Sequence, residues 1–166
     1  NFAAVHMKRT KMKFDKPIYT GFTVLEISKL SMYESYYDII QHYWGEEQLK
    51  VHYMDTDAFV LEVTTEDLQK DLYNLRDHMD FSEYPKDNPL YNNEHEAQLG
   101  RYKDELKGKE MIEFVGIRSK MYAYRTEGNG EVKKSKGTPR QVVDKKLRIE
   151  MYLESLYTNK IFIEEN

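Results

Sequence analysis

The stretch His52-Tyr53-Met54-Asp55-Thr56-Asp57-Ala58-Phe59 sets two aspartates between apolar and aromatic residues. The residues on either side of the pair, 49–53 and 58–63, have the composition of two short strands, which predicts a bend at the aspartates. Aspartate is unfavourable inside a strand, and side chains two positions apart on a strand lie on the same side of it. The pattern therefore allows two interpretations. One is a pair of carboxylates that holds a divalent cation such as Mg²⁺, and the other is a hairpin turn with solvated acids.

A long helix is predicted before this stretch, from about residue 20 to residue 44. Its apolar side chains recur with the 3.6-residue period of a helix, and we expect the helix to lie against a sheet. Gly45 is a favourable stop signal, and Lys16-Pro17 separates the helix from residues 5–14, where loose alternation predicts a short strand or hairpin arm. The residues that carry the helical period are Leu25, Met32, Tyr36, Ile39 and Tyr43, and the stripe is widened by Tyr33, Tyr37, Ile40 and Trp44.

The rest of the chain is predicted to form short elements joined by loops. A helix is expected to begin with Thr65 as its cap and to end near Asp77, and the proline- and asparagine-rich residues 81–93 predict a long loop. Strands are predicted over 99–106, 111–117 and 121–126, followed by a turn over 127–131 and short helices over 141–147 and 150–157. This order predicts an α+β fold with an antiparallel sheet.

Composition limits the class of protein. The chain has 166 residues and no cysteine, which suits one domain with a sizeable core and excludes disulfides and thiolate zinc sites. No apolar run is long enough to span a bilayer, so we expect a soluble intracellular protein with no membrane partner. The net charge of −4 is segregated, because residues 1–16 carry +4 and residues 116–148 carry +7, which leaves −15 on the remainder. Such basic segments suit a phosphate backbone, and the alternative is a pair of ordinary solvated faces.

Several phrases of the sequence resemble the family B DNA polymerases. That family's third sequence motif, a tyrosine, a variable residue and then DTDS, is similar to Tyr53-Met54-Asp55-Thr56-Asp57-Ala58, where Ala58 replaces the usual serine. Its KxY motif at the palm–thumb junction resembles Ser119-Lys120-Met121-Tyr122. The protein-primed branch, and within it the polymerases of Maverick/Polinton-type mobile elements and related viruses, is similar over residues 16–34 (KPIYTGFTVLEISKLSMYE), 113–124 (EFVGIRSKMYAY) and 133–147 (KKSKGTPRQVVDKKL).

The resemblance implies a palm-type antiparallel sheet backed by helices, with the long helix preceding a DTD hairpin. It implies that Asp57 and Asp55 form the catalytic pair, in which Asp57 binds two Mg²⁺ ions and Asp55 assists, during nucleotide transfer from a dNTP to a primer on template DNA. Lys120 and Tyr122 are expected to contact the primer strand near its 3′ end, and Tyr53 to shape the hairpin and that contact. The basic residues expected to follow the DNA backbone are Lys133, Lys134, Lys136, Arg140, Lys145 and Lys146.

The same resemblance implies a partial palm domain over residues 1–126 and a basic segment leading into the thumb over 127–166. Two family motifs are missing, the upstream one near a DxxSLYPS pattern with the other metal-binding aspartate, and the lysine-bearing helix that grips the triphosphate. We therefore expect an incomplete Mg²⁺ site, no activity from this chain alone, and the rest of the polymerase or another chain as the partner that supplies these motifs. An intracellular location such as the nucleus or a viral replication site is expected. The alternative is a domesticated or remnant palm fold without catalysis that binds nucleic acid or a protein.

For the other candidate residues the sequence pattern favours structural roles. The five histidines show no spacing typical of a metal site. For Asp104 and Glu105 the sequence favours a solvated hairpin over a role as additional acids near the aspartate pair. Aromatic residues at helical spacing favour core packing over base stacking, and these are Tyr33, Tyr36, Tyr37, Tyr43 and Trp44.

Overall fold

A long helical segment opens the part of the chain that the computed structural model describes, residues 15–163. Helix α1 (Ile18–Glu34) continues through a π-helical segment, η1 (Ser35–Ile40), into α2 (Gln41–Trp44). Gly45, with φ of 83°, ends the segment in a backbone conformation that favours glycine. The predicted long helix before the aspartates is thus present, whereas the strand or arm predicted over residues 5–14 lies outside the described residues.

The aspartates follow in an antiparallel hairpin of β1 (Leu49–Asp55) and β2 (Ala58–Val63). Asp55 lies opposite Ala58, so Thr56 and Asp57 form the two-residue connection between the strands. The register shifts between Val51 and Tyr53, which marks a bulge in β1.

The next elements are short. Helix α3 (Leu68–Asn74) is capped by Asp67, whose carboxylate accepts a hydrogen bond from the Lys70 N–H at 3.0 Å, so the prediction of Thr65 as the cap was wrong. A 3₁₀ turn, η2 (Arg76–His78), leads to β3 (Met79–Asp80), which pairs in parallel with β4 (Tyr102–Lys103). The strand predicted over 99–106 is therefore only two residues long, and residues 81–93 form a loop, as predicted.

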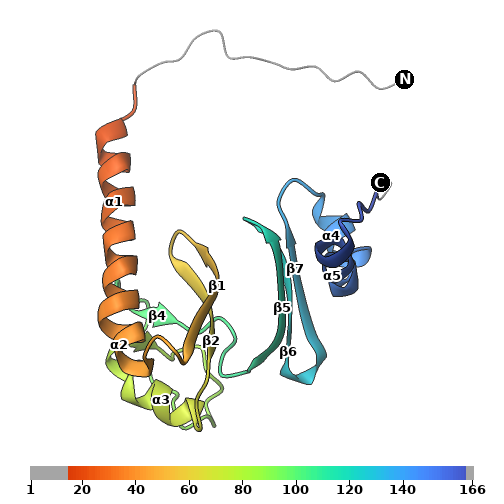
Figure 1. Cartoon of the computed structure of the whole chain (residues 1–166). Helices are drawn as coiled ribbons and strands as arrows, with labels where there is room; N and C mark the ends of the chain where they lie inside the picture. The colour runs from red at the N-terminus through yellow and green to blue at the C-terminus, as the bar shows by residue number, and fades with distance from the viewer. Residues whose placement is uncertain (1–14, 164–166) are drawn as a thin grey trace.

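Asp71 ties α3 to the end of the long helical segment. It accepts hydrogen bonds from Tyr43 Oη and Trp44 Nε1, each at 3.0 Å, and from Thr65 Oγ1 at 2.5 Å. The network fixes α2 and α3 against each other near the base of the hairpin (Figure 1).

The C-terminal part is a three-stranded meander with two helices on one face (Figure 1). Its strands are β5 (Met111–Arg118), β6 (Met121–Thr126) and β7 (Gly130–Ser135), in the order β5-β6-β7, with the turn η3 (Glu127–Asn129) between the last two. Helices α4 (Arg140–Lys145) and α5 (Ile149–Thr158) follow. Strand β7 was not predicted, and it pairs with β6 across the boundary expected after Thr126.

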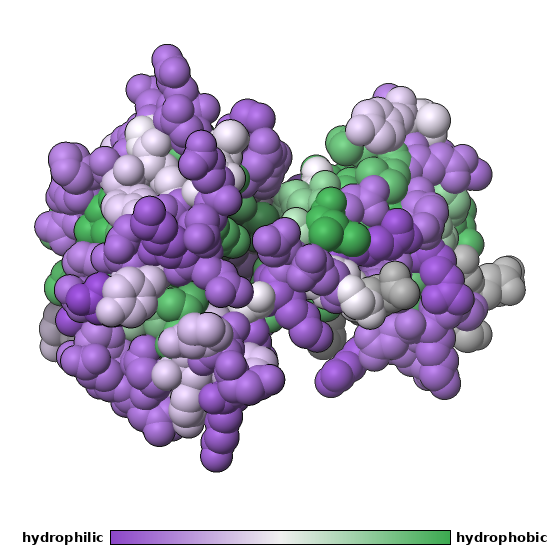
Figure 2. Space-filling view, turned by 90° about the horizontal axis from the view of Figure 1, so that it is seen from below, coloured by the Kyte–Doolittle hydropathy of each residue, from purple (hydrophilic) through white to green (hydrophobic). Residues whose placement is uncertain are grey.

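The described residues contain two separate hydrophobic clusters, one in each half of the molecule. Phe81, Tyr84 and Leu90 form the first, against which Leu72 of α3 and Met79 of β3 pack. In the second, Ile149 packs with Val115 and other residues between α5 and the three-stranded sheet. Figure 2 shows two masses joined by a narrower region. In residues 15–163 the strands thus form three small sheets, two of them antiparallel, and not one continuous sheet.

The long helix is mostly solvent-exposed. Met32 is the buried residue of α1, and Tyr102 Oη contacts its sulfur at 3.1 Å. The expectation that this helix lies against a sheet was therefore wrong for most of its length, and core packing was wrong for Tyr33, Tyr37 and Tyr43, which are all exposed. Among the described residues, no helix is both long enough and apolar enough to cross a membrane. The large apolar side chains that α1 leaves exposed are Ile18, Tyr19, Phe22, Val24, Leu25, Ile27, Leu30 and Tyr33.

Candidate functional site

The tip of the β1–β2 hairpin has an unusual backbone. Thr56 has a φ of 59°, and the Asp57 N–H donates a hydrogen bond to the Asp55 carbonyl oxygen at 2.6 Å. A positive φ is costly for a β-branched residue, and such conformations often occur at functional sites. The turn leaves the Asp57 side chain exposed, and within residues 15–163 its carboxylate has no hydrogen-bond or ion-pair partner.

The Asp55 carboxylate is held by Lys120 and Thr56, and a third donor, Tyr53, lies at a longer distance. The Asp55 Oδ2 atom forms an ion pair with Lys120 Nζ and lies 3.4 Å from Tyr53 Oη, while its Oδ1 atom accepts from Thr56 Oγ1 at 3.2 Å. The Lys120 ammonium lowers the pKa of Asp55, although partial burial opposes this shift. In the same way the Asp55 carboxylate raises the pKa of Lys120. Both groups are therefore charged at neutral pH.

Lys120 comes from the turn between β5 and β6, far from Asp55 in the sequence. Its φ is 60°, and its backbone N–H donates to Tyr53 Oη at 2.8 Å. The ring centroid of Tyr53 lies 4.8 Å from that of Tyr122 and 6.3 Å from that of Phe114. The segment around the aspartates and the Lys120-Met121-Tyr122 segment thus meet where the two halves of the molecule join.

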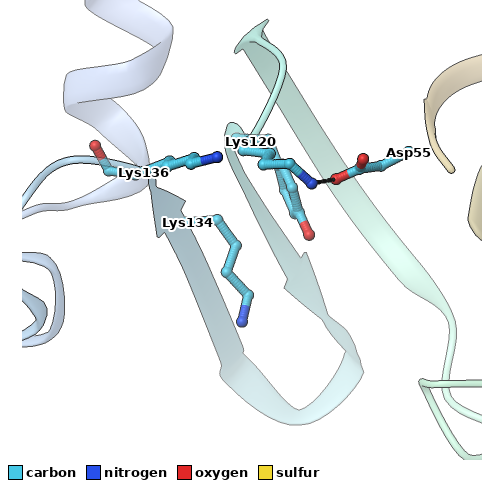
Figure 3. Close-up of a pocket in the computed structure, with 6 residues that line it drawn as sticks. Asp55, Lys120, Lys134 and Lys136 are labelled. Atoms are coloured by element: carbon cyan, nitrogen blue, oxygen red, sulfur yellow. Dashed lines mark hydrogen bonds and ion pairs between the residues drawn. The ribbon is translucent and has the colours of Figure 1, made fainter. Parts of the chain in front are cut away.

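An open cavity of about 330 Å³ adjoins this contact (Figure 3). Tyr122 lies opposite Lys134 in the β6–β7 pair, and the Lys136 N–H donates to the Lys120 carbonyl oxygen at 3.0 Å, so pairing of the strands brings three lysines together. Figure 3 shows Lys136 extending toward Lys120, with Asp55 on the far side of Lys120. The cavity is lined by Asp55, Lys120, Tyr122, Lys134, Ser135 and Lys136.

Lys134 and Lys136 are the two lysines of this cavity without a counter-charge. Both are exposed, and among the described residues neither ammonium has an ion-pair or hydrogen-bond partner. Together with Lys120 they give the cavity an excess of positive charge over the single carboxylate of Asp55. Such a cavity suits an anionic group such as a phosphate.

The other basic residues predicted to follow DNA do not line the cavity. Lys133 points away from the cavity, and its side chain is only 10% exposed. Its ammonium donates to the Leu147 carbonyl oxygen at 2.9 Å and pairs with Glu131 at 3.3 Å. Arg140 is exposed on α4 and pairs with Asp144 at 3.5 Å. Lys145 ends α4 and Lys146 follows it, both exposed on the helical side of the three-stranded sheet.

The carboxylates present fit Mg²⁺ only in part. Within residues 15–163, no group of three or more His, Cys, Asp or Glu side chains is arranged to hold a metal ion. Asp57 offers one free carboxylate, and Asp55 offers a second that is already paired with Lys120. Since Mg²⁺ is often bound by one or two carboxylates together with phosphates and water, the pair fits this ion once phosphates or another acidic segment complete the shell.

Sequence reasoning did not identify Phe114 and Ser135 as site residues. The available signal for Ser135 was its position between Lys134 and Lys136, two residues predicted from their charge. Comparisons with protein-family models, with curated proteins and with solved structures each found no match for this chain. A functional assignment therefore depends on the sequence motifs and on the geometry of this site.

Proposed function

We propose that this chain is the palm and the start of the thumb of a protein-primed family B DNA polymerase. The reaction is template-directed transfer of a nucleotide from a dNTP to a primer 3′-OH. The observation that supports the proposal is the contact between the two motif segments, in which Tyr53 and Asp55 meet Lys120 although 65 or more residues separate them. Both segments carry the resemblance to that family, and their meeting beside a lysine-rich cavity suits one shared site for DNA.

In this proposal each side chain has a separate task. Asp57 would hold Mg²⁺, which would supply charge neutralisation during phosphoryl transfer. Asp55 positions Lys120, and Lys120 with Tyr122 holds the primer end. Lys134 and Lys136 bind phosphates of the DNA backbone without reading its sequence.

The proposed partner is the rest of the polymerase or another chain that supplies the missing acidic motif. Two observations support such a partner. Among the described residues, the hairpin tip offers too few carboxylates for a two-metal site. Helix α1 exposes a set of large apolar side chains, which in a folded protein are normally buried against another surface. A polypeptide that packs on α1 would cover this surface and bring its own carboxylate toward the hairpin, which lies beside α1 (Figure 1).

Primer extension tests the proposal. The protein and its Asp57→Asn variant are compared on a primer–template with Mg²⁺ and dNTPs, and extension that disappears in Asp57→Asn supports a polymerase site. DNA binding is measured in parallel at two salt concentrations, because each phosphate contact adds about −0.9 to the slope of log K against log salt on duplex DNA. Lys134→Ala or Lys136→Ala is expected to reduce this slope, whereas Lys70→Ala on α3, away from the cavity, serves as the matched control.

A second candidate is a remnant palm fold that binds nucleic acid or a protein partner without catalysis. The observation that favours it is the Asp55–Lys120 ion pair, which occupies a carboxylate that a working metal site would need. Salt-sensitive DNA binding with no extension, even when the missing motifs are supplied, would favour this candidate. Loss of both activities would argue against any role at DNA and would leave the α1 surface as a site for a protein.

A further inference from the structure

The Asp55–Lys120 ion pair lies between two positions for ligands of opposite charge. On one side is the hairpin tip, where the Asp57 carboxylate is free among the described residues. On the other side is the cavity, where Lys134 and Lys136 have no ion-pair partner within residues 15–163. In the ion pair Asp55 and Lys120 neutralise each other. The negative charge of Asp55 is therefore not available to a cation at the hairpin tip, and the positive charge of Lys120 is not available to an anion in the cavity.

The backbone of Lys120 is fixed independently of this ion pair. Its N–H donates to Tyr53 Oη at 2.8 Å and its carbonyl oxygen accepts from the Lys136 N–H at 3.0 Å. The side chain is 45% exposed, so its ammonium has room to turn. Separation of the ion pair therefore needs a rotation of one side chain and no movement of the turn.

A group that binds either partner changes the charge available to the other. A divalent cation at Asp55 competes with the Lys120 ammonium, and an anionic phosphate in the cavity competes with the Asp55 carboxylate. Release of Lys120 adds a third uncompensated ammonium beside Lys134 and Lys136. Exposed ion pairs contribute little, so the gain in a binding constant is about 1.5- to 5-fold.

We infer that the Asp55–Lys120 pair couples cation binding at the hairpin tip to phosphate binding in the cavity, so that each ligand strengthens the binding of the other. Such coupling is reciprocal by thermodynamic linkage. The inference rests on the proposed function for the choice of ligands, which are Mg²⁺ and a nucleic-acid phosphate. Asp55 is then a positioning residue that neutralises the Lys120 ammonium at the edge of the cavity until the cation is bound.

A double-mutant cycle in the absence of metal tests the coupling. The probe is a fluorescein-labelled oligothymidylate, and its dissociation constant is measured by fluorescence anisotropy. Asp55→Asn removes the partner of Lys120 and is expected to tighten binding by about 1.5- to 5-fold. The same substitution in a Lys120→Ala background is expected to give a smaller gain, because it removes only the repulsion between one carboxylate and the probe and no ammonium remains to be released.

A second readout uses Mg²⁺ at constant ionic strength, which is expected to tighten binding by the wild-type protein and not by Asp55→Asn. In the metal-free measurement Asp57→Asn is the control for simple charge, since it removes a carboxylate two residues away and leaves the ion pair intact. Circular dichroism checks that each variant is folded.

An equal gain from Asp55→Asn in both backgrounds, or from Asp57→Asn, would show plain repulsion of the probe and overturn the inference. The cycle needs neither dNTP nor turnover. A failure of primer extension therefore leaves its result interpretable, and a failure of coupling leaves the polymerase proposal standing.

Discussion

Tyr53→Phe is expected to weaken the joint between the two halves of the molecule. The hydroxyl accepts the Lys120 N–H at 2.8 Å, and its contact with Asp55 at 3.4 Å is too long to add much. A net intramolecular hydrogen bond is worth about 0.5–1.5 kcal/mol, and the lower half of this range applies because water reaches the Lys120 N–H. The ring contacts with Tyr122 and Phe114 remain in the variant, so the free energy of unfolding falls by the hydrogen-bond contribution alone.

Urea denaturation at neutral pH measures this loss, with an unchanged m-value as evidence that the change is in stability. Tyr19→Phe is the matched control, because Tyr19 is 78% exposed on α1 and its hydroxyl makes no hydrogen bond among the described residues. Tyr53→Leu removes the aromatic contacts as well and is expected to cost roughly a further 0.5–1.5 kcal/mol. A Tyr53→Phe variant as stable as Tyr19→Phe would refute the role of the hydroxyl at this joint.

Two further predictions concern stability. Burial alone would raise the pKa of Asp71, but the hydrogen bonds that it accepts outweigh burial and lower it, so its contribution to stability is present above about pH 4 and lost as the pH falls through the lowered folded-state pKa. Asp71→Asn should therefore lose less stability between neutral and acidic pH than the wild type does. Urea midpoints at the two pH values measure this loss, and an equal loss in the variant and the wild type would contradict the prediction. Ile149→Ala should cost about 2–5 kcal/mol and Phe81→Ala about 3–5 kcal/mol, because both side chains are almost fully buried. Since their clusters are separate, hydrogen exchange should accelerate mainly around the substituted cluster, and equal acceleration in both halves would contradict independent cores.

Local patterns predicted the elements whose side chains follow a clear period. The long helix and the strands β5 and β6 are examples, because their apolar spacing or β-branched and aromatic content is unambiguous. Strand β7 was missed because Glu131-Val132-Lys133-Lys134-Ser135 holds one apolar residue and was interpreted by its charge. In the structure β7 is an edge strand, where lysines are common.

A sequence period also does not show what covers a helix. The apolar residues of α1 predicted contact with a sheet, but no described element covers most of them. The period reports only that these side chains favour burial, and the covering surface depends on tertiary structure.

The site was predictable in its residue types and not in its contacts. The two aspartates, Lys120 and Tyr122 were candidates from the motifs alone, whereas the hydrogen bond from Lys120 to Tyr53 joins residues 67 positions apart and depends on how the two halves meet. Lys133 and Lys134 look equivalent in the sequence. Alternation along β7 separates them, since Lys134 faces the cavity and Lys133 turns toward α4.

If the two motif segments form one DNA site of a polymerase palm, as proposed, the chain should prefer a primer end to a fully paired duplex. Fluorescence anisotropy compares a labelled primer–template with a recessed 3′ end and a fully paired duplex of the same length, at one salt concentration. We expect tighter binding of the recessed end and loss of this preference in Lys120→Ala but not in Lys70→Ala. Equal binding of the two DNAs, or a preference that survives Lys120→Ala, would contradict the proposed site.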